Sequence, residues 1–354
     1  MTDLTPQEIH RRALAGDGDA QFMVARLFDR EGKHDVAVGW LQKAADGGHA
    51  LAANYLGVRM LTGQAAPHAP QTGAKLTYQA AEAGNGEACA RAAVLNALGI
   101  GRAASWIKAH DWLREAIRAR HPGAAEQLEL LKAEADFLGQ TGPLDLESLI
   151  ASPEAVVAVE DPRIWVVERF CSPHTCRWIA QRSASRLEAA RTYDARAGGR
   201  AQTDMRSNTG TGYGLKDSDL VITLLRARIA HALGVPLGWF EPVNVLHYDP
   251  GQKFDRHYDF IDPDVPHFAD DLRSRGQRTA TALVYLNDAY EGGETDFPEI
   301  GYDFKGDVGD LLVFFNVTPD GKPDKRTLHA GTPPTSGEKW LLSQWIRDKA
   351  QPLL

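Results

Sequence analysis

The chain has 354 residues, a net charge of -8 and three cysteines. A chain of this length exceeds the size at which one hydrophobic core usually keeps growing, so we expect two domains. The acidic balance argues against nucleic acid as a partner, because a chain that binds nucleic acid would carry a basic face. The first residues lack a basic start followed by an apolar run, and no window of about eighteen uncharged apolar residues is present, so we expect no membrane partner and a cytoplasmic location.

The first third of the chain repeats itself with a period of 36 residues (76 - 40 and 112 - 76). The copies begin at Trp40, Leu76 and Trp112. Such a period is typical of a helical solenoid, in which each pair of helices buries its apolar face on the next pair. Small residues recur where two helices must approach closely, at Ala44, Ala80 and Ala116 and again at Ala52, Ala88 and Ala124.

The segment 8–135 resembles tetratricopeptide-like repeats of the Sel type. The resemblance implies an all-α solenoid whose concave surface recruits a protein or peptide partner. An alternative stays open, in which so few units only stabilise or dimerise the rest of the protein. The three cysteines cannot all pair and are not closely spaced in the manner of a zinc site, so we expect buried thiols.

A change of pattern marks the second domain. Gly139–Pro143 and Ser152–Glu154 interrupt the helical periodicity, so we expect a linker over 136–158 and a domain over 159–350. A helix or two followed by many short antiparallel strands and Gly-rich turns predicts an α+β domain built on a jelly roll, the double-stranded β-helix. The predicted helix begins after Ser172, and the clearest strands are Ile164–Val167, Val243–Leu246, Thr279–Leu286 and Leu311–Phe315.

Three residues of this second domain form a candidate metal site. His257 and Asp259 are two positions apart, so on a strand both side chains would lie on one face while Tyr258 points away. His329 follows 72 residues later (329 - 257) and would complete the set from another strand. Two histidines and one carboxylate, with the remaining positions open, describe a non-haem Fe(II) oxygenase site.

From about residue 160 to 348, the chain resembles the prolyl 4-hydroxylase family of Fe(II)- and 2-oxoglutarate-dependent dioxygenases. One departure is Pro334, which stands where the family usually has a small β-branched residue, and it affects only local loop packing. The matching segments are Tyr248–Asp259, Arg278–Asp288, Glu291–Pro298, Lys305–Asp307, Leu328–Pro333 and Gly337–Trp340.

The resemblance implies roles for particular residues. His257, Asp259 and His329 would bind Fe(II), and Lys339 would pair with the distal carboxylate of 2-oxoglutarate. Tyr248 matches a tyrosine whose hydroxyl faces this cosubstrate, although a core tyrosine is the alternative. Tyr285 and Thr295 would line the same pocket, and each could equally be a packing residue. The cofactors implied are Fe(II), 2-oxoglutarate and O2, with ascorbate as the reductant.

Two polar segments flank the candidate site. The segment 192–208 is too long for a simple turn and predicts a lid or a binding loop. The resemblance implies that it folds over the substrate. By the resemblance, Arg206 and Trp345 are the candidate substrate contacts, with a solvated arginine and a core tryptophan as the alternatives. The segment 262–275 reads as a second loop, in which His267 is expected to be an ordinary surface histidine.

The leading functional hypothesis is hydroxylation of a prolyl residue in a protein or peptide, coupled to decarboxylation of 2-oxoglutarate to succinate and CO2. Three alternatives remain. The enzyme could hydroxylate a free amino acid or small molecule, or the domain could sense metal or oxoacid without turnover. Nucleic-acid demethylation is disfavoured by the acidic charge and by the lack of a basic aromatic stripe.

Overall fold

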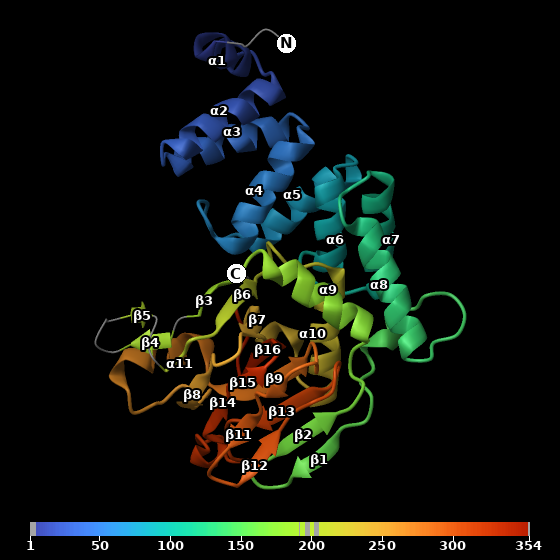
Figure 1. The fold of residues 1–354 in the computed structure, drawn as a ribbon. Helices are drawn as coiled ribbons and strands as arrows, with labels where there is room; N and C mark the ends of the chain where they lie inside the picture. The colour runs from blue at the N-terminus through green and yellow to red at the C-terminus, as the bar shows by residue number, and fades with distance from the viewer. Residues whose placement is uncertain (1–4, 191, 195–198, 202–204, 353–354) are drawn as a thin grey trace. The chain divides into compact units, whose positions relative to one another are not determined.

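The computed structural model describes residues 5–190, 192–194, 199–201 and 205–352. Two compact units make up the chain, the first comprising 1–129, 215–223 and 352–354 and the second comprising 130–214 and 224–351. The first unit is helical and the second is rich in antiparallel strands, which confirms the predicted fold class (Figure 1). Within the part of the chain that is described, no helix is both long and apolar enough to cross a membrane.

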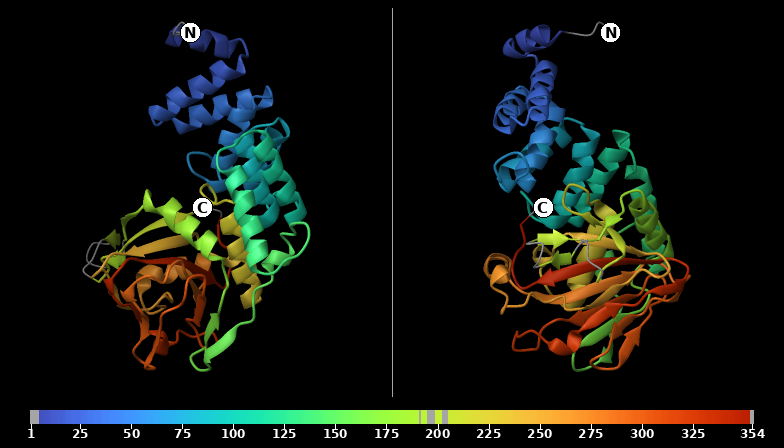
Figure 2. Two further views of the ribbon diagram at one scale, coloured as in Figure 1. Left: turned by 45° about the vertical axis from the view of Figure 1, so that its right-hand side comes forward. Right: turned by 60° about the vertical axis from the view of Figure 1, so that its left-hand side comes forward.

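The N-terminal helices follow the repeat found in the sequence (Figure 2). The first helices of three successive pairs begin at His34, Pro70 and Trp106, again 36 residues apart (70 - 34 and 106 - 70). The recurring alanines of the repeat are all buried at 1% exposure or less, which confirms their role in close helix packing. The helices are α1 (Pro6–Leu14), α2 (Gly18–Arg30), α3 (His34–Asp46), α4 (Ala50–Thr62), α5 (Pro70–Glu82), α6 (Gly86–Leu98), α7 (Trp106–Arg118) and α8 (Ala124–Phe137).

The last repeat helix, α8, continues into the second unit. Its residue Glu134 is buried and accepts hydrogen bonds from the Ser172 amide and the Thr175 hydroxyl at the start of α9 (Pro173–Ala184). Glu134 also forms a 2.7 Å ion pair with Arg228 of α10 (Leu220–Leu233). The compact units therefore divide at 129/130, before the linker predicted over 136–158.

Two facing sheets form the jelly roll of the second unit (Figure 1). The larger sheet has the strand order β1-β2-β13-β9-β16-β7-β6-β3, and the smaller has the order β12-β11-β14-β8. The larger sheet contains β1 (Val156–Val159), β2 (Ile164–Val167), β3 (Glu188–Ala189), β6 (Thr209–Tyr213), β7 (Val243–Tyr248), β9 (Arg278–Tyr285), β13 (Leu311–Phe315) and β16 (Lys339–Arg347). The smaller contains β8 (Phe254–His257), β11 (Thr295–Phe297), β12 (Tyr302–Phe304) and β14 (His329–Gly331), and two separate pairs join β4 (Thr192–Asp194) to β5 (Gly199–Ala201) and β10 (Glu291–Gly292) to β15 (Pro334–Ser336).

The core of the second unit lies between these sheets. Phe297 of the smaller sheet packs with Leu283 and Phe314 of the larger sheet, and all three are buried. Because side chains alternate along a strand, the neighbouring inward positions near this core are available to line a pocket. The three cysteines are free and buried, as expected.

The structure corrects the prediction for one of the two expected loops, and the second is described only in part. The segment 262–275 contains a short 3-10 helix, Pro266–Phe268, and the helix α11 (Ala269–Arg275), where the sequence predicted a loop. Acidic residues in the first turn of α11 and arginines in its last turn complement the helix dipole. In the segment 192–208, residues 195–198 and 202–204 lie outside the described residues, so the predicted binding loop stays a prediction.

Candidate metal centre and cosubstrate pocket

Strand register brings the two candidate histidine ligands together. His257 at the end of β8 is the cross-strand partner of His329 in β14, and the ring centroids are 4.2 Å apart. Asp259 follows the end of β8 and lies in an irregular segment, which differs from the expectation that His257 and Asp259 share a strand face. The candidate ligand atoms of these three residues nevertheless lie within 4.8 Å of one another.

Backbone carbonyls fix the orientation of both imidazoles. Nδ1 of His257 donates to the carbonyl of Asp255 at 2.8 Å, and Nδ1 of His329 donates to the carbonyl of Thr327 at 3.0 Å. Each bond places the proton on Nδ1, so Nε2 carries the lone pair that a metal needs. Phe254 stacks on the His257 ring at 3.5 Å and further restricts its rotation.

The carboxylate ligand is held by Thr281 of β9, which is in turn bonded by Asn316, the residue that follows β13. The hydroxyl of Thr281 donates to Oδ2 of Asp259 at 2.7 Å, and the Asn316 side-chain amide donates to that hydroxyl at 3.0 Å. All three residues are buried. Partners of this kind orient ligand groups and tune their affinity for a metal.

The electrostatics of the site favour the protonation states in which these side chains can bind a metal. Burial, followed by the charge that His329 would carry, lowers the pKa of His257 to about 3. Burial acts to raise the pKa of Asp259, but His329 and His257 outweigh it, so this pKa is lowered from its usual value. At neutral pH, the site therefore presents a neutral His257 imidazole beside an ionised carboxylate, a donor set that suits Fe(II).

A cavity of about 1350 Å³ opens onto this centre and extends to Lys339 on β16. Lys339 is fully buried, and burial lowers its pKa to about 7. Among the described residues, the one hydrogen bond recorded for its Nζ goes to the Gly293 carbonyl at 2.6 Å. A buried ammonium with one neutral partner is costly, and the carboxylate of an oxoacid would compensate it.

The predicted cosubstrate residues differ in how they meet the cavity. Tyr248 is the cross-strand partner of Lys339, lines the cavity, and has no recorded hydrogen bond from its hydroxyl within the described structure. Thr295 also lines the cavity and is buried. Tyr285 is buried behind this lining, and its hydroxyl bonds the Thr295 hydroxyl at 2.8 Å and the Phe304 carbonyl at 3.1 Å. Tyr248 and Thr295 are therefore placed to meet a cosubstrate, whereas Tyr285 supports Thr295.

Both predicted substrate residues line the cavity. Arg206 is buried, donates from Nε to Asn208 at 2.8 Å, and lies 4.3 Å from the centroid of the Phe254 ring, so it is not a solvated surface arginine. Trp345 is half-buried and stacks under the guanidinium of Arg278 at 3.6 Å. His267 is exposed, as expected, although it lies at the cavity wall.

Several supporting residues were missed by sequence reasoning. Thr281 and Asn316 gave no signal, because each is a polar residue at the edge of or within an apolar strand run. Glu241, which pairs with Arg278 at 2.7 Å, comes just before a strand and resembled a surface residue. Pairing across the sheet, rather than spacing in sequence, creates these contacts.

A second group of possible ligands lies outside the cavity lining. His247, Asp249 and Glu338 also place their ligand atoms within 4.8 Å of one another. Nε2 of His247 is paired with Glu338 at 3.2 Å, and the two carboxylates are more than half exposed. The buried His257, Asp259 and His329 group is therefore the better metal candidate.

Comparison with known proteins agrees with this geometry. Residues 243–347 match the model of the 2OG-Fe(II) oxygenase superfamily. Over 205 residues, the chain is 34% identical to Prolyl 4-hydroxylase 1 of Arabidopsis thaliana, covering 53% of this chain and 70% of that protein. It is 33% identical over 208 residues to Probable prolyl 4-hydroxylase 9 of the same plant, covering 54% and 70%. The chain belongs to the prolyl 4-hydroxylase family. Its C-terminal domain is thus a 2-oxoglutarate-dependent dioxygenase that uses Fe(II).

Solved structures resemble each part of the chain. A viral collagen prolyl hydroxylase from Paramecium Bursaria Chlorella virus-1, in complex with 2OG, is 29% identical, covers 52% of this chain and 95% of its own, and has a TM-score of 0.41. A Sel1 repeat protein from Oxalobacter formigenes is 26% identical, covers 35% of this chain and 96% of its own, and has a TM-score of 0.33.

Proposed function

We propose that the protein hydroxylates a prolyl residue in a protein or peptide. The observation that carries this proposal is the joint presence, in one cavity, of the His257, Asp259 and His329 cluster and the buried cation Lys339. The similarity to prolyl 4-hydroxylases supports proline as the target residue.

The residues of the site have separate roles in this reaction. His257, Asp259 and His329 would hold Fe(II), Lys339 would pair with the distal carboxylate of 2-oxoglutarate, and Tyr248 would orient that cosubstrate. When bound, Fe(II), 2-oxoglutarate and O2 supply the oxidant for a C–H bond, while 2-oxoglutarate is converted to succinate and CO2. The cavity walls would hold the target carbon beside the metal ligands.

The size of the cavity favours a polymeric substrate over a small molecule. Its volume of about 1350 Å³ exceeds the roughly 300–1,000 Å³ of typical small-molecule sites. Met205 and Tyr258 line it and leave 48% and 37% of their surfaces exposed, which suits contact with a peptide chain. A free amino acid would leave most of this lining without contact.

The N-terminal repeats are proposed to recruit the protein target, and ascorbate is proposed as the reductant that maintains Fe(II). The cytoplasmic location stays a prediction. A chain that lacks residues 1–69 tests recruitment, since it removes α1 to α4 and leaves Glu134 of α8 in place. We expect it to lose turnover of a protein target while retaining turnover of a short peptide.

The proposed reaction is tested with the full-length protein, Fe(II), 2-oxoglutarate and a panel of proline-containing peptides. Each peptide is paired with an analogue in which alanine replaces proline. Mass spectrometry should detect one added oxygen on proline, with succinate formed in equal amount. Succinate formation that no proline peptide stimulates, but that a small molecule does, would contradict the prolyl assignment.

A further inference from the structure

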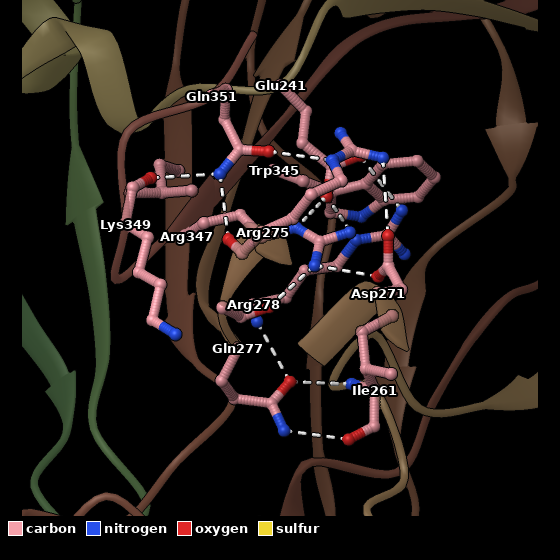
Figure 3. Close-up of polar contacts among 12 residues, drawn as sticks. Glu241, Ile261, Asp271, Arg275, Gln277, Arg278, Trp345, Arg347, Lys349 and Gln351 are labelled. Carbon is pink, nitrogen blue, oxygen red and sulfur yellow. Dashed lines mark hydrogen bonds and ion pairs between the residues drawn. The ribbon is translucent and has the colours of Figure 1, made fainter. Parts of the chain in front are cut away.

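Three arginines form one wall of the cavity, which we call the arginine wall: Arg275, Arg278 and Arg347 (Figure 3). They come from the end of α11, the start of β9 and the end of β16. Arg278 and Arg347 are cross-strand partners. The turn that carries Arg275 is closed by Gly276, whose positive φ of 77° favours glycine and whose carbonyl accepts from Arg347 at 2.6 Å. The three cations are therefore held close together by the backbone.

Two carboxylates balance these three cations only in part. Glu241 is 6% exposed and accepts from Nε of Arg278 at 2.7 Å and from Nε of Arg347 at 2.6 Å (Figure 3). Asp271 is 31% exposed and accepts from Arg347 at 2.8 Å. Burial acts to raise the pKa of Glu241, but Arg278 and Arg347 outweigh it and hold it at about 2. Glu241 is thus ionised at neutral pH, and the three arginines outnumber the two carboxylates by one.

Arg275 has the most unused hydrogen-bonding capacity of the arginine wall. Its Nε donates to the side chain of Gln351 at 2.9 Å, as Figure 3 shows. Its Nη atoms lie 3.7 Å from Glu241 and 3.5 Å from Asp271, which are ion-pair distances but not good hydrogen bonds. Burial is the main cause that lowers the pKa of Arg275, and the nearby Glu241 opposes it, so the side chain is partly desolvated without a close carboxylate partner.

The arginine wall is separated from the metal ligands along strand β9. Thr281, which bonds Asp259, is three positions along β9 from Arg278 (281 - 278). Three strand residues span about 10 Å. Trp345, the cross-strand partner of Thr281, fills the interval with its ring against Arg278. Measured along the backbone of β9, this separation corresponds to roughly two or three extended residues, and it sets the range in which we place a substrate group at the arginine wall.

We propose that the arginine wall, through Arg275, binds a carboxylate of the peptide substrate, two or three residues from the hydroxylated position. This inference rests on the proposed function and names the substrate class as an acidic peptide. Guanidinium groups recognise carboxylates through paired hydrogen bonds, and Arg275 has Nη donors for such a pair. The carboxylate belongs either to an Asp or Glu side chain or to the C-terminus of the peptide. The α-carboxylate of free proline would be too close to its own ring to reach the wall.

The charge of the cavity agrees with an acidic substrate. Among the described residues that line it, six are Lys or Arg and four are Asp or Glu, and Glu241 behind the arginine wall raises the acids to five, so one positive charge is in excess although the whole chain carries a net charge of -8. Fe(II) and the 2-oxoglutarate dianion cancel one another, so an excess of positive charge remains for the substrate. Such a field raises the local concentration of an anionic peptide.

The test uses the full-length protein with Fe(II) and 2-oxoglutarate under anaerobic conditions, so that binding is measured without turnover. Fluorescence anisotropy compares labelled peptides that carry one proline and either Glu or Gln at each position from four before to four after it. Each peptide is made with a free and with an amidated C-terminus, which separates the two sources of carboxylate. The variants are Arg275→Gln and Arg275→Lys. Arg273→Gln is the matched control, because Arg273 lies on the same helix, is exposed, and is outside the cavity lining.

We expect a carboxylate at one position, two or three residues from proline or at the C-terminus, to tighten binding about tenfold over its neutral match. Arg275→Gln should reduce this preference to about twofold, Arg275→Lys should keep an intermediate preference, and Arg273→Gln should leave it unchanged. The inference would be overturned if the protein bound Glu and Gln peptides with equal affinity. It would also be overturned if Arg275→Gln weakened the binding of both peptides by the same factor.

Turnover in air then separates this inference from the proposed function. Binding that is tighter for peptides with a carboxylate, without hydroxylation of any peptide, would support the carboxylate subsite and contradict the prolyl hydroxylase assignment. Hydroxylation of neutral and acidic peptides with equal kcat/KM would support the assignment and overturn the subsite.

Discussion

The Thr281 hydroxyl donates a 2.7 Å hydrogen bond to Oδ2 of Asp259, so a strand of the larger sheet fixes a ligand that follows a strand of the smaller sheet. Replacing Thr281 with valine keeps the shape of the side chain and removes this bond. Loss of such a partner typically weakens metal binding by about 10- to 100-fold. We expect Thr281→Val to raise the Fe(II) dissociation constant by this factor in anaerobic titration calorimetry.

Thr279→Val on the same strand is the control for that experiment. Among the described residues, the hydroxyl of Thr279 has one hydrogen bond, to the Ile346 carbonyl at 3.4 Å. Its replacement should leave the Fe(II) affinity within about twofold of the original, a difference below the effect typical of ligand-orienting partners. Equal affinities in the two variants would show that Thr281 does not position Asp259.

The pKa of Lys339 predicts how 2-oxoglutarate binding depends on pH. Burial lowers this pKa to about 7, so the amine is charged below pH 7 and neutral above it in the absence of cosubstrate. His257, with a pKa of about 3, does not titrate in this range. We expect the 2-oxoglutarate dissociation constant, measured anaerobically from pH 6.5 to 8.5, to rise by up to about tenfold per pH unit above 7.

Lys339→Met should bind 2-oxoglutarate weakly and without this pH dependence. The same substitution should raise the stability of the cosubstrate-free protein most below pH 7. The unfolded chain keeps the lysine proton up to its ordinary pKa of 10.5, whereas the folded chain releases it near 7, so the stability linked to Lys339 rises between these values and is lost as pH falls toward 7. An unchanged pH profile in Lys339→Met would contradict the assigned role.

The buried pair Glu134–Arg228 predicts that α8 is required for folding of the dioxygenase domain. Both side chains are at most 3% exposed, and Glu134 also accepts from the start of α9. Removing one charge of a buried pair typically costs about 3–5 kcal/mol. Glu134→Gln should therefore lower the urea midpoint of the second unit strongly, whereas Glu126→Gln on the exposed face of α8 should not. Equal urea midpoints in the two variants would mean that the Glu134–Arg228 pair contributes little to the stability of the second unit.

Close packing of α4 against α5 predicts opposite outcomes for two Gly→Ala substitutions. A Cβ at Gly73 would lie 2.6 Å from the Gly57 carbonyl oxygen, whereas a Cβ at Gly39 would have no neighbour within 4 Å. Gly73→Ala should destabilise the repeats by about 1–3 kcal/mol. Gly39→Ala, in the exposed interior of α3, should stabilise them by roughly 0.5–1 kcal/mol. Thermal unfolding followed by circular dichroism measures both, and equal shifts would contradict the packing.

Local patterns predicted the elements of the fold well. The apolar runs Ile164–Val167 and Leu311–Phe315 coincide with β2 and β13. Ser172 accepts a hydrogen bond from the Thr175 amide and caps α9, as expected. The repeat period located the first helix of each pair because one period corresponds to one packed unit. These features depend on neighbours in sequence, which periodicity reports directly.

Contacts across the sheets were not predictable in the same way. The alternation rule placed Asp259 on a strand with His257, but β8 ends at His257 and Asp259 is held by Thr281 instead. Within the predicted linker 136–158, Leu149 is buried and its carbonyl accepts from Arg228 at 2.8 Å, a contact that had no signal in the sequence. Such contacts follow from strand register and from the partners that buried charges require, neither of which has a local signature.

Succinate formation from 2-oxoglutarate by the Fe(II)-loaded, full-length protein tests the central claim most directly. The measurement compares the original protein with His257→Ala, Asp259→Ala and His329→Ala, and with His267→Ala as the control histidine at the same cavity. We predict Fe(II)-dependent succinate formation by the original protein and by His267→Ala, and none by the three ligand variants. Fe(II)-dependent succinate formation that persists in a ligand variant, or its absence from the iron-loaded original protein, would contradict the account.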